Sequence, residues 1–243
     1  MNYYNDNDPY CAAWLENLIL FNHIPYGIVD SRPIQEVTPN DIKDFRQCHF
    51  FAGIGGWAYA LRLAGWPDDK PVWTGSCPCQ PFSIIGQGKG FQDERHLWPE
   101  WFRLIRQCRP ATIFAEQVAN ALSWVDLVFS DLERTDYACT AFDIPAASIG
   151  ARHQRQRLWF VADSNTTRWT NSKRESATKT VARIRATTCV VSGKSVEQIR
   201  GTFEPDQNWI VDGVLGTGDI VCSLGNSIVP QVAAEFVKAY LEI

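Results

Sequence analysis

The spacing of apolar residues predicts alternating strands and helices along most of the chain. Apolar residues between positions 11 and 18 recur at helical spacing after Asp8 and Pro9, which predicts a capped helix to about residue 20. Apolar runs predict strands at residues 28–29, 50–52, 72–74, 111–115, 138–142 and 158–162, with helices at 58–63, 98–106 and 120–134. A last amphipathic helix follows Pro230, and we expect it to pack beside the N-terminal helix. This alternation favours an α/β fold, a Rossmann-like sheet with helices on both faces.

Two loops at strand ends carry candidate chemistry. The run at residues 50–52 ends in glycines before a helix, an arrangement that lets a cofactor approach backbone N–H groups, although a simple tight turn has the same pattern. Cys79 follows the strand at residues 72–74 and lies between Pro78 and Pro81, which hold the loop extended. A nucleophilic thiol and a small core cysteine are both compatible with this position. Glycines at 86, 88 and 90 then predict a mobile loop that closes over a ligand.

Charged residues border two further predicted strands. Glu116 follows the strand at residues 111–115, where it would point into the ligand crevice of an α/β sheet or cap the next helix. Arg155 and Arg157 directly precede the strand at 158–162, either as site residues or as a surface cationic patch.

Composition limits the class of protein. The 243 residues are 45% hydrophobic, enough for one core, and no run of about 18 apolar residues or N-terminal signal is present. Eight cysteines without a signal sequence favour a reducing cytoplasm, and their spacing predicts no zinc site. Residues 164–202 hold eight basic and two acidic residues within a chain of net charge −4. This segment, with Lys173, Arg174 and Arg183, predicts either a phosphate-contacting face or a solvated loop.

Five short segments, in order, resemble the DNA cytosine-C5 methyltransferases of the short phage and prokaryotic type. They are the glycine turn at residues 51–56, Pro78-Cys79-Gln80, Glu116-Gln117-Val118, Arg155-Gln156-Arg157 and the segment at residues 225–230. The resemblance implies a Cys79 thiolate that attacks C6 of a flipped cytosine, Glu116 at N3 and Arg155 at O2, with Arg157 alongside. It also implies S-adenosylmethionine as methyl donor, bound by Asp6, Asp30, Phe51, Ala52, Gly53, Ile54, Gly55, Gly56, Pro78, Asn226 and Ser227.

The order of the units departs from that family. Two strand units that carry the ribose-binding and adenine-binding acids usually separate the glycine turn from the Pro-Cys loop, but here only 22 residues lie between Gly56 and Cys79. Residues 5–10 resemble the ribose-binding unit, with Asp6 as the acid, and residues 27–30 resemble the adenine-binding strand. There Ile28 occupies the acid's place and Asp30 is a possible substitute. The resemblance therefore implies a circularly permuted chain; an unrelated extension over residues 1–48 is the alternative.

The resemblance implies residues 1–163 and 219–243 as the catalytic, cofactor-binding domain and residues 164–218 as a short target-recognition region. It further implies double-stranded DNA as partner, a role in restriction-modification, and DNA contacts from Gln80, Ser83, Lys173, Arg174 and Arg183. We expect a cytoplasmic monomer. Two alternatives stay open: the same chemistry on RNA, and a non-catalytic DNA-binding relative.

Overall fold

A computed structural model of the chain describes residues 1–78, 97–119, 121–151, 154–164 and 227–242. Most of the predicted recognition region, residues 165–218, lies outside this part, so the predicted domain division stays a prediction. The described strands are β1 (Asn2–Asn5), β2 (Gly27–Asp30), β3 (Gln47–Phe50), β4 (Val72–Gly75), β5 (Thr112–Val118), β6 (Ala138–Pro145) and β7 (Gln156–Asp163). The helices are α1 (Pro9–Leu20), α2 (Pro39–Ile42), α3 (Gly56–Leu63), α4 (Trp98–Cys108), α5 (Leu122–Glu133) and α9 (Pro230–Leu241), with 3-10 turns η1 (Ile34–Glu36) and η4 (Ala146–Ile149).

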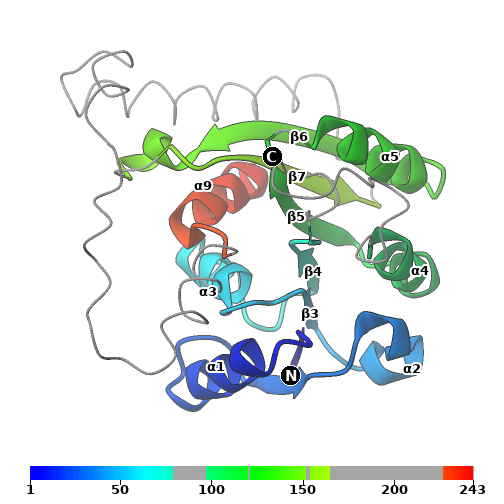
Figure 1. Ribbon diagram of the computed structural model, residues 1–243, viewed down its shortest axis with the longest axis vertical. Coiled ribbons are helices and arrows are strands. Elements are labelled where there is room, and N and C mark those ends of the chain that lie inside the picture. The colour runs from blue at the N-terminus through cyan, green and yellow to red at the C-terminus, as the bar shows by residue number, and fades with distance from the viewer. Residues whose placement is uncertain (79–96, 120, 152–153, 165–226, 243) are drawn as a thin grey trace.

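The strands form one mixed sheet in the order β2-β1-β3-β4-β5-β7-β6. The pairs from β2 through β5 are parallel, whereas β7 runs antiparallel to both β5 and β6. Helices cover both faces: α1, α3 and α9 lie on one face, and α2, α4 and α5 on the other (Figure 1). This arrangement confirms the predicted Rossmann-like α/β fold.

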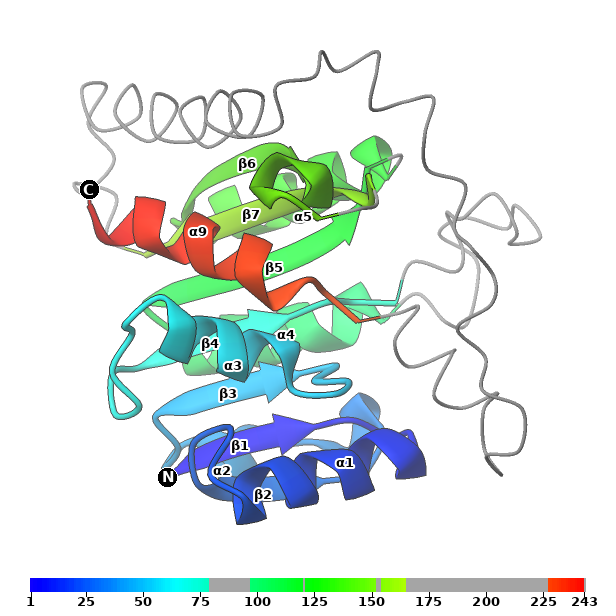
Figure 2. The same ribbon diagram turned by 90° about the vertical axis from the view of Figure 1, so that its left-hand side faces the viewer.

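The order of helices on the first face corrects one prediction. Helix α3 lies between α1 and α9, so the C-terminal helix packs against α3 instead of the N-terminal helix (Figure 2). Trp57 and Leu61 of α3 share a buried cluster with Val232 and Phe236 of α9, whereas Leu15 of α1 belongs to a separate cluster near β1. The prediction failed because helix amphipathicity says which face is buried but not against which neighbour.

Most element boundaries follow the sequence patterns. Helix α1 begins as predicted, because the Asp8 side chain accepts hydrogen bonds from the backbone N–H groups of Tyr10 (2.8 Å) and Cys11 (3.3 Å). The strand predicted at residues 50–52 lies earlier: β3 ends at Phe50, because Phe51 has a left-handed φ of 51°. Strand β5 continues past the predicted end to Val118, where it still pairs with Arg157 of β7. Glu116 therefore lies inside a strand, which excludes the alternative of a helix-capping role.

Gly75 allows a close approach between β4 and α4. A Cβ atom at Gly75 would lie 2.5 Å from the indole of Trp101, a fully buried and rigid side chain. The absence of a side chain there lets Trp101 pack directly on the end of β4. This strand end leads into residues 77–80, the Pro-Cys segment.

We therefore predict that Gly75→Ala lowers the free energy of unfolding by about 1–3 kcal/mol through overpacking. Trp101→Phe removes the ring atoms that would clash, so the double variant should be less destabilised than the sum of the single variants by about 1 kcal/mol. Urea denaturation of the four proteins measures this coupling. Additive effects would contradict the proposed contact.

Candidate active site

Glu116 is the central charged group near the carboxyl ends of the parallel strands. It is buried, with 7% exposure, and its Oε1 atom lies 2.7 Å from Nε of Arg157. Burial raises the pKa of the Glu116 carboxyl, while Arg157, the Ser76 hydroxyl and Arg155 act in the opposite direction. The raised pKa favours a carboxyl group that can hold a proton and donate a hydrogen bond.

Ser76 and Trp57 extend this site toward α3. Ser76 follows β4 directly, and its hydroxyl acts to lower the pKa of the neighbouring Glu116 carboxyl. The indole Nε1 of Trp57, in the first turn of α3, donates to the Ser76 hydroxyl oxygen at 3.1 Å. Neither residue was among the predicted site residues, because a serine and a tryptophan in separate elements have no pattern that links them.

Arg155 joins the site to the segment before α9. Its guanidinium donates a hydrogen bond to the backbone carbonyl of Ser227, and its backbone has a left-handed φ of 33°. Burial, together with repulsion from Arg157, lowers the pKa of Arg155, and Glu116 opposes that shift. The structure thus brings three predicted residues together: Glu116, Arg155 and Arg157. Ser227 contacts this group through its carbonyl.

The beginning of the Pro-Cys segment is anchored to β5. The side-chain amide of Gln117 donates to the backbone carbonyl of Cys77 at 3.2 Å, and its oxygen accepts from the N–H of Val118 at 2.9 Å. Gln117 is buried, and sequence analysis assigned it no role of its own. Pro78 is the last described residue of this segment. The predicted site residues Cys79, Gln80, Ser83, Lys173, Arg174, Arg183 and Asn226 lie outside the described residues.

The glycine turn forms a second group beside the first. Asp6 follows β1, and its Oδ2 atom accepts a hydrogen bond from the Gly53 N–H at 2.7 Å. Its other oxygen accepts from the N–H of Asp8 at 3.0 Å. Burial raises the pKa of Asp6 against the effect of these two bonds. A Cβ atom at Gly53 would meet no described atom within 4 Å, so the turn leaves space on that side.

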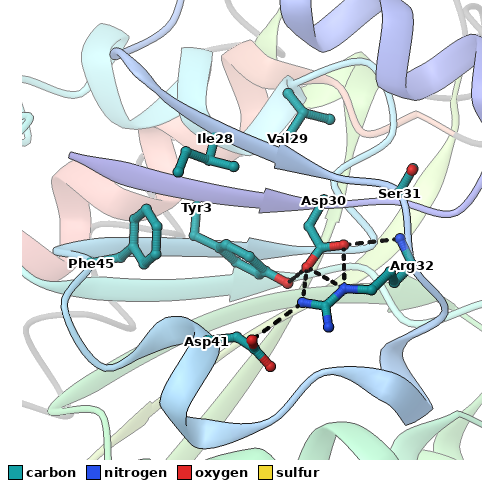
Figure 3. Close-up of a pocket in the computed structure, with 8 residues that line it drawn as sticks. All are labelled: Tyr3, Ile28, Val29, Asp30, Ser31, Arg32, Asp41 and Phe45. Carbon is teal, nitrogen blue, oxygen red and sulfur yellow. Dashed lines mark hydrogen bonds and ion pairs between the residues drawn. The ribbon is translucent and has the colours of Figure 1, made fainter.

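Asp30 lies farther out, beside a pocket of about 340 Å³ at the edge of the sheet (Figure 3). Its carboxylate accepts from the Tyr3 hydroxyl at 2.7 Å and from the Arg32 guanidinium at 2.6 Å. Burial alone would raise the pKa of Asp30, but the hydrogen bonds from Arg32 and Tyr3 outweigh it and lower the pKa. Ile28, which occupies the expected acid's place, is 47% exposed and lines the same pocket.

The arrangement suits proton donation and charge stabilisation by side chains. Among the described residues, no group of three or more His, Cys, Asp or Glu side chains could hold a metal ion. No helix in the described ranges combines the length and the hydropathy needed to cross a membrane.

Comparison with known proteins identifies the family. The family model described as C-5 cytosine-specific DNA methylase matches residues 65–211, which is more than half of the chain. The protein therefore belongs to the C-5 cytosine-specific DNA methylase family.

Individual relatives match parts of the chain. The type II methyltransferase M.HhaI of Haemophilus parahaemolyticus is 30% identical over 171 residues, covering 54% of this chain and 52% of the relative. The type II methyltransferase M.CviJI of Paramecium bursaria Chlorella virus IL3A is 30% identical over 136 residues, covering 54% and 36%. The chain thus spans about half or less of the length of these curated relatives. The structure of the Entamoeba histolytica methyltransferase EhMeth is also similar, with a TM-score of 0.44 and 15% identity over 70% of this chain and 55% of that one.

The buried ion pair of Glu116 with Arg157 generates a stability prediction. Arg157→Gln should lower the free energy of unfolding by about 3 kcal/mol at neutral pH, because it leaves a buried carboxylate without its partner. Arg157 stabilises the charged carboxylate, so its contribution is present above the pKa of Glu116 and is lost as pH falls through it. The cost of the substitution should therefore shrink toward acid pH in urea denaturation.

A surface pair serves as the control. Lys238 and Glu235 are also 2.7 Å apart but both are exposed, so Lys238→Gln should cost less than about 1 kcal/mol. The double variant Glu116→Gln/Arg157→Gln should recover part of the loss. Equal costs for Arg157→Gln and Lys238→Gln would contradict this account.

Proposed function

We propose that this protein transfers a methyl group from S-adenosylmethionine to C5 of cytosine in double-stranded DNA, through a covalent bond between Cys79 and C6. The placement of Glu116 carries this proposal. It is a buried carboxyl with a raised pKa, held by Arg157, on the strand next to the one that leads into the Pro-Cys segment. Family membership supports the same chemistry.

The reaction requires activation of C5, which is not nucleophilic enough in cytosine itself. Attack of the Cys79 thiolate forms an S–C6 bond, and C5 becomes enamine-like and able to take the methyl group. A general base then takes the C5 proton, the S–C6 bond breaks with release of the Cys79 thiolate, and N3 returns its proton, which restores the aromatic ring. Protonated Glu116 would donate to N3 as negative charge develops there, and the Arg155 guanidinium would hold O2. The base edges are inaccessible in a duplex, so the target is flipped out.

The residues around the glycine turn fit the proposed cofactor. S-adenosylmethionine supplies the electrophilic methyl group when bound. The Asp6 carboxylate, which already accepts the Gly53 N–H, would accept from ribose hydroxyls through its remaining lone pairs. Residues 51–56, Pro78 and the segment with Asn226 and Ser227 would line the rest of this site. Asp30 stays our candidate for the adenine contact.

We further propose that the chain is a circular permutation of the usual family order. In the usual order the two strand units with the cofactor-binding acids follow the glycine turn. Here β1 and β2 precede that turn in the sequence, yet β1 pairs directly with β3 and β2 with β1. The hydrogen bond between Asp6 and Gly53 supports the assignment of β1 as the ribose-binding unit.

The type II designation of the relatives supports a role in restriction-modification. The basic segment at residues 164–202 supports phosphate contacts. No observation favours RNA as the substrate. Methyl transfer measured on DNA and on RNA separates these two possible substrates.

Cys79→Ser is expected to abolish methyl transfer and leave S-adenosylmethionine binding near the wild-type level, because a hydroxyl is a far poorer nucleophile than a thiolate. DNA that carries 5-fluorocytosine should trap a covalent adduct on Cys79, detectable by peptide mass spectrometry. Cys77→Ser is the matched control and should still form the adduct. An adduct that maps to Cys77 would refute the assignment.

For Asp6→Asn we expect S-adenosylmethionine to bind roughly 10- to 100-fold more weakly, since charge-assisted hydrogen bonds become neutral ones. The fold should persist, because an amide oxygen can still accept the Gly53 N–H. Asp8→Asn removes the same charge two residues away and keeps the helix cap, so its affinity should equal that of the wild type. Calorimetric titration of the three proteins decides; equal affinities in all three would exclude Asp6 from the cofactor site.

A further inference from the structure

We propose that Ser76 is a positioning residue that orients Glu116 and sets its protonation, and that the Trp57 indole fixes the direction in which the Ser76 hydroxyl donates. This inference rests on the proposed function, in which Glu116 contacts the target base.

The direction of the two hydrogen bonds follows from the chemistry of the groups. An indole N–H can only donate, so the Ser76 oxygen accepts from Trp57 Nε1 at 3.1 Å. A hydroxyl has one proton, which is then available to Glu116. In its charged form Glu116 can only accept, so the chain runs from Trp57 through Ser76 to Glu116.

The positions of these groups are fixed by the sheet. Gly75 of β4 pairs with Ala115 of β5. The next residues along these parallel strands, Ser76 and Glu116, therefore lie side by side toward the carboxyl ends of the strands. Arg157 holds the carboxyl of Glu116 from β7, with Nε 2.7 Å from Oε1, and Ser76 stands beside Glu116 at the end of β4. Donation from Ser76 on the side opposite Arg157 would restrict rotation of the carboxyl group about its terminal bond.

Trp57 is itself held rigidly. Its ring stacks on Phe114, with centroids 6.2 Å apart and planes at 19°, and meets Trp159 edge-on at 5.6 Å. It is buried, with 4% exposure. Trp57 also follows Gly56 directly, so this hydrogen-bonded chain connects the glycine turn with the carboxyl proposed to contact the base.

The electrostatic consequence has a definite sign. The charged groups that face Glu116 are Arg157 and Arg155, both from the segment that enters β7, and Ser76 faces it from the end of β4. Donation from Ser76 favours the carboxylate and so opposes the rise in the pKa that burial causes. Removal of the hydroxyl should therefore raise the pKa further.

The test follows the titration of Glu116 in the full chain without DNA, by NMR of glutamate labelled with 13C at the carboxyl carbon; Glu116→Gln assigns the resonance. Ser76→Ala should move the midpoint upward by about one pH unit. Trp57→Phe should move it in the same direction by less, because the hydroxyl keeps its proton but loses its fixed orientation. Ser76→Thr, which keeps the hydroxyl, should titrate as the wild type does.

Two control variants separate this effect from general disturbance of the core. Trp66→Phe removes another buried indole that packs on Phe114 but donates to the Lys70 carbonyl, so it should leave the titration unchanged. Ser148→Ala removes a buried hydroxyl that has no partner among the described residues. It should therefore also leave the titration of Glu116 unchanged. An unchanged midpoint in Ser76→Ala, or an equal shift in Trp57→Phe and Trp66→Phe, would overturn the proposal.

Methyl transfer to DNA, measured across pH, separates this inference from the proposed function. If protonated Glu116 is the active form, the alkaline limb of kcat/KM in Ser76→Ala should move upward together with the NMR midpoint. A wild-type protein without methyl transfer would refute the proposed function, while the DNA-free titration would still decide whether Ser76 and Trp57 control Glu116. If the wild type is active but its kcat/KM profile has the same alkaline limb as that of Ser76→Ala, the positioning role alone is refuted.

Discussion

Close packing around the glycine turn between β3 and α3 is the constraint on which the rest of the structure depends. A Cβ atom at Gly55 would lie 2.9 Å from Leu18 of α1, and one at Gly56 would lie 2.7 Å from Ile228, just before α9. Gly55 also has a left-handed φ of 80°. Because neither position has a side chain, elements from both ends of the described chain can contact the start of α3. The proposed cofactor site and the buried face of the sheet are thus built around the same few residues.

Strand direction explains how the charged residues come together. Parallel strands β4 and β5 end at the same edge of the sheet, which places Ser76 beside Glu116. Strand β7 runs antiparallel to β5, so it begins at that edge, and its early residue Arg157 reaches Glu116. Had β7 been parallel, its first residues would lie at the opposite edge. The antiparallel pairing of β7 with β5 therefore supplies the cation that stabilises the buried carboxylate.

The early placement of Asp6 in the sequence shows that chain order and spatial order are separate properties. Asp6 lies 47 residues before Gly53, yet the two are joined by a 2.7 Å hydrogen bond. Parallel pairing of β1 with both β2 and β3 produces this contact. A sheet of this kind needs each strand to have its neighbours, and it does not need those neighbours to follow in a particular order along the chain.

The sequence by itself determined the fold class and most helix and strand positions, and it pointed to Glu116, Arg155 and Arg157 as candidate site residues, because apolar periodicity, capping residues and the short segments of the family are local properties. Strand β5 was predicted to end too early, since its extension depends on pairing with β7. Only the tertiary structure decided that α3 separates α1 from α9, that Gln117 holds the Cys77 carbonyl, and that Trp57 donates to Ser76 beside Glu116. These features depend on which elements are neighbours in the sheet. Side chains on different elements meet through long-range packing, which no spacing within one segment encodes.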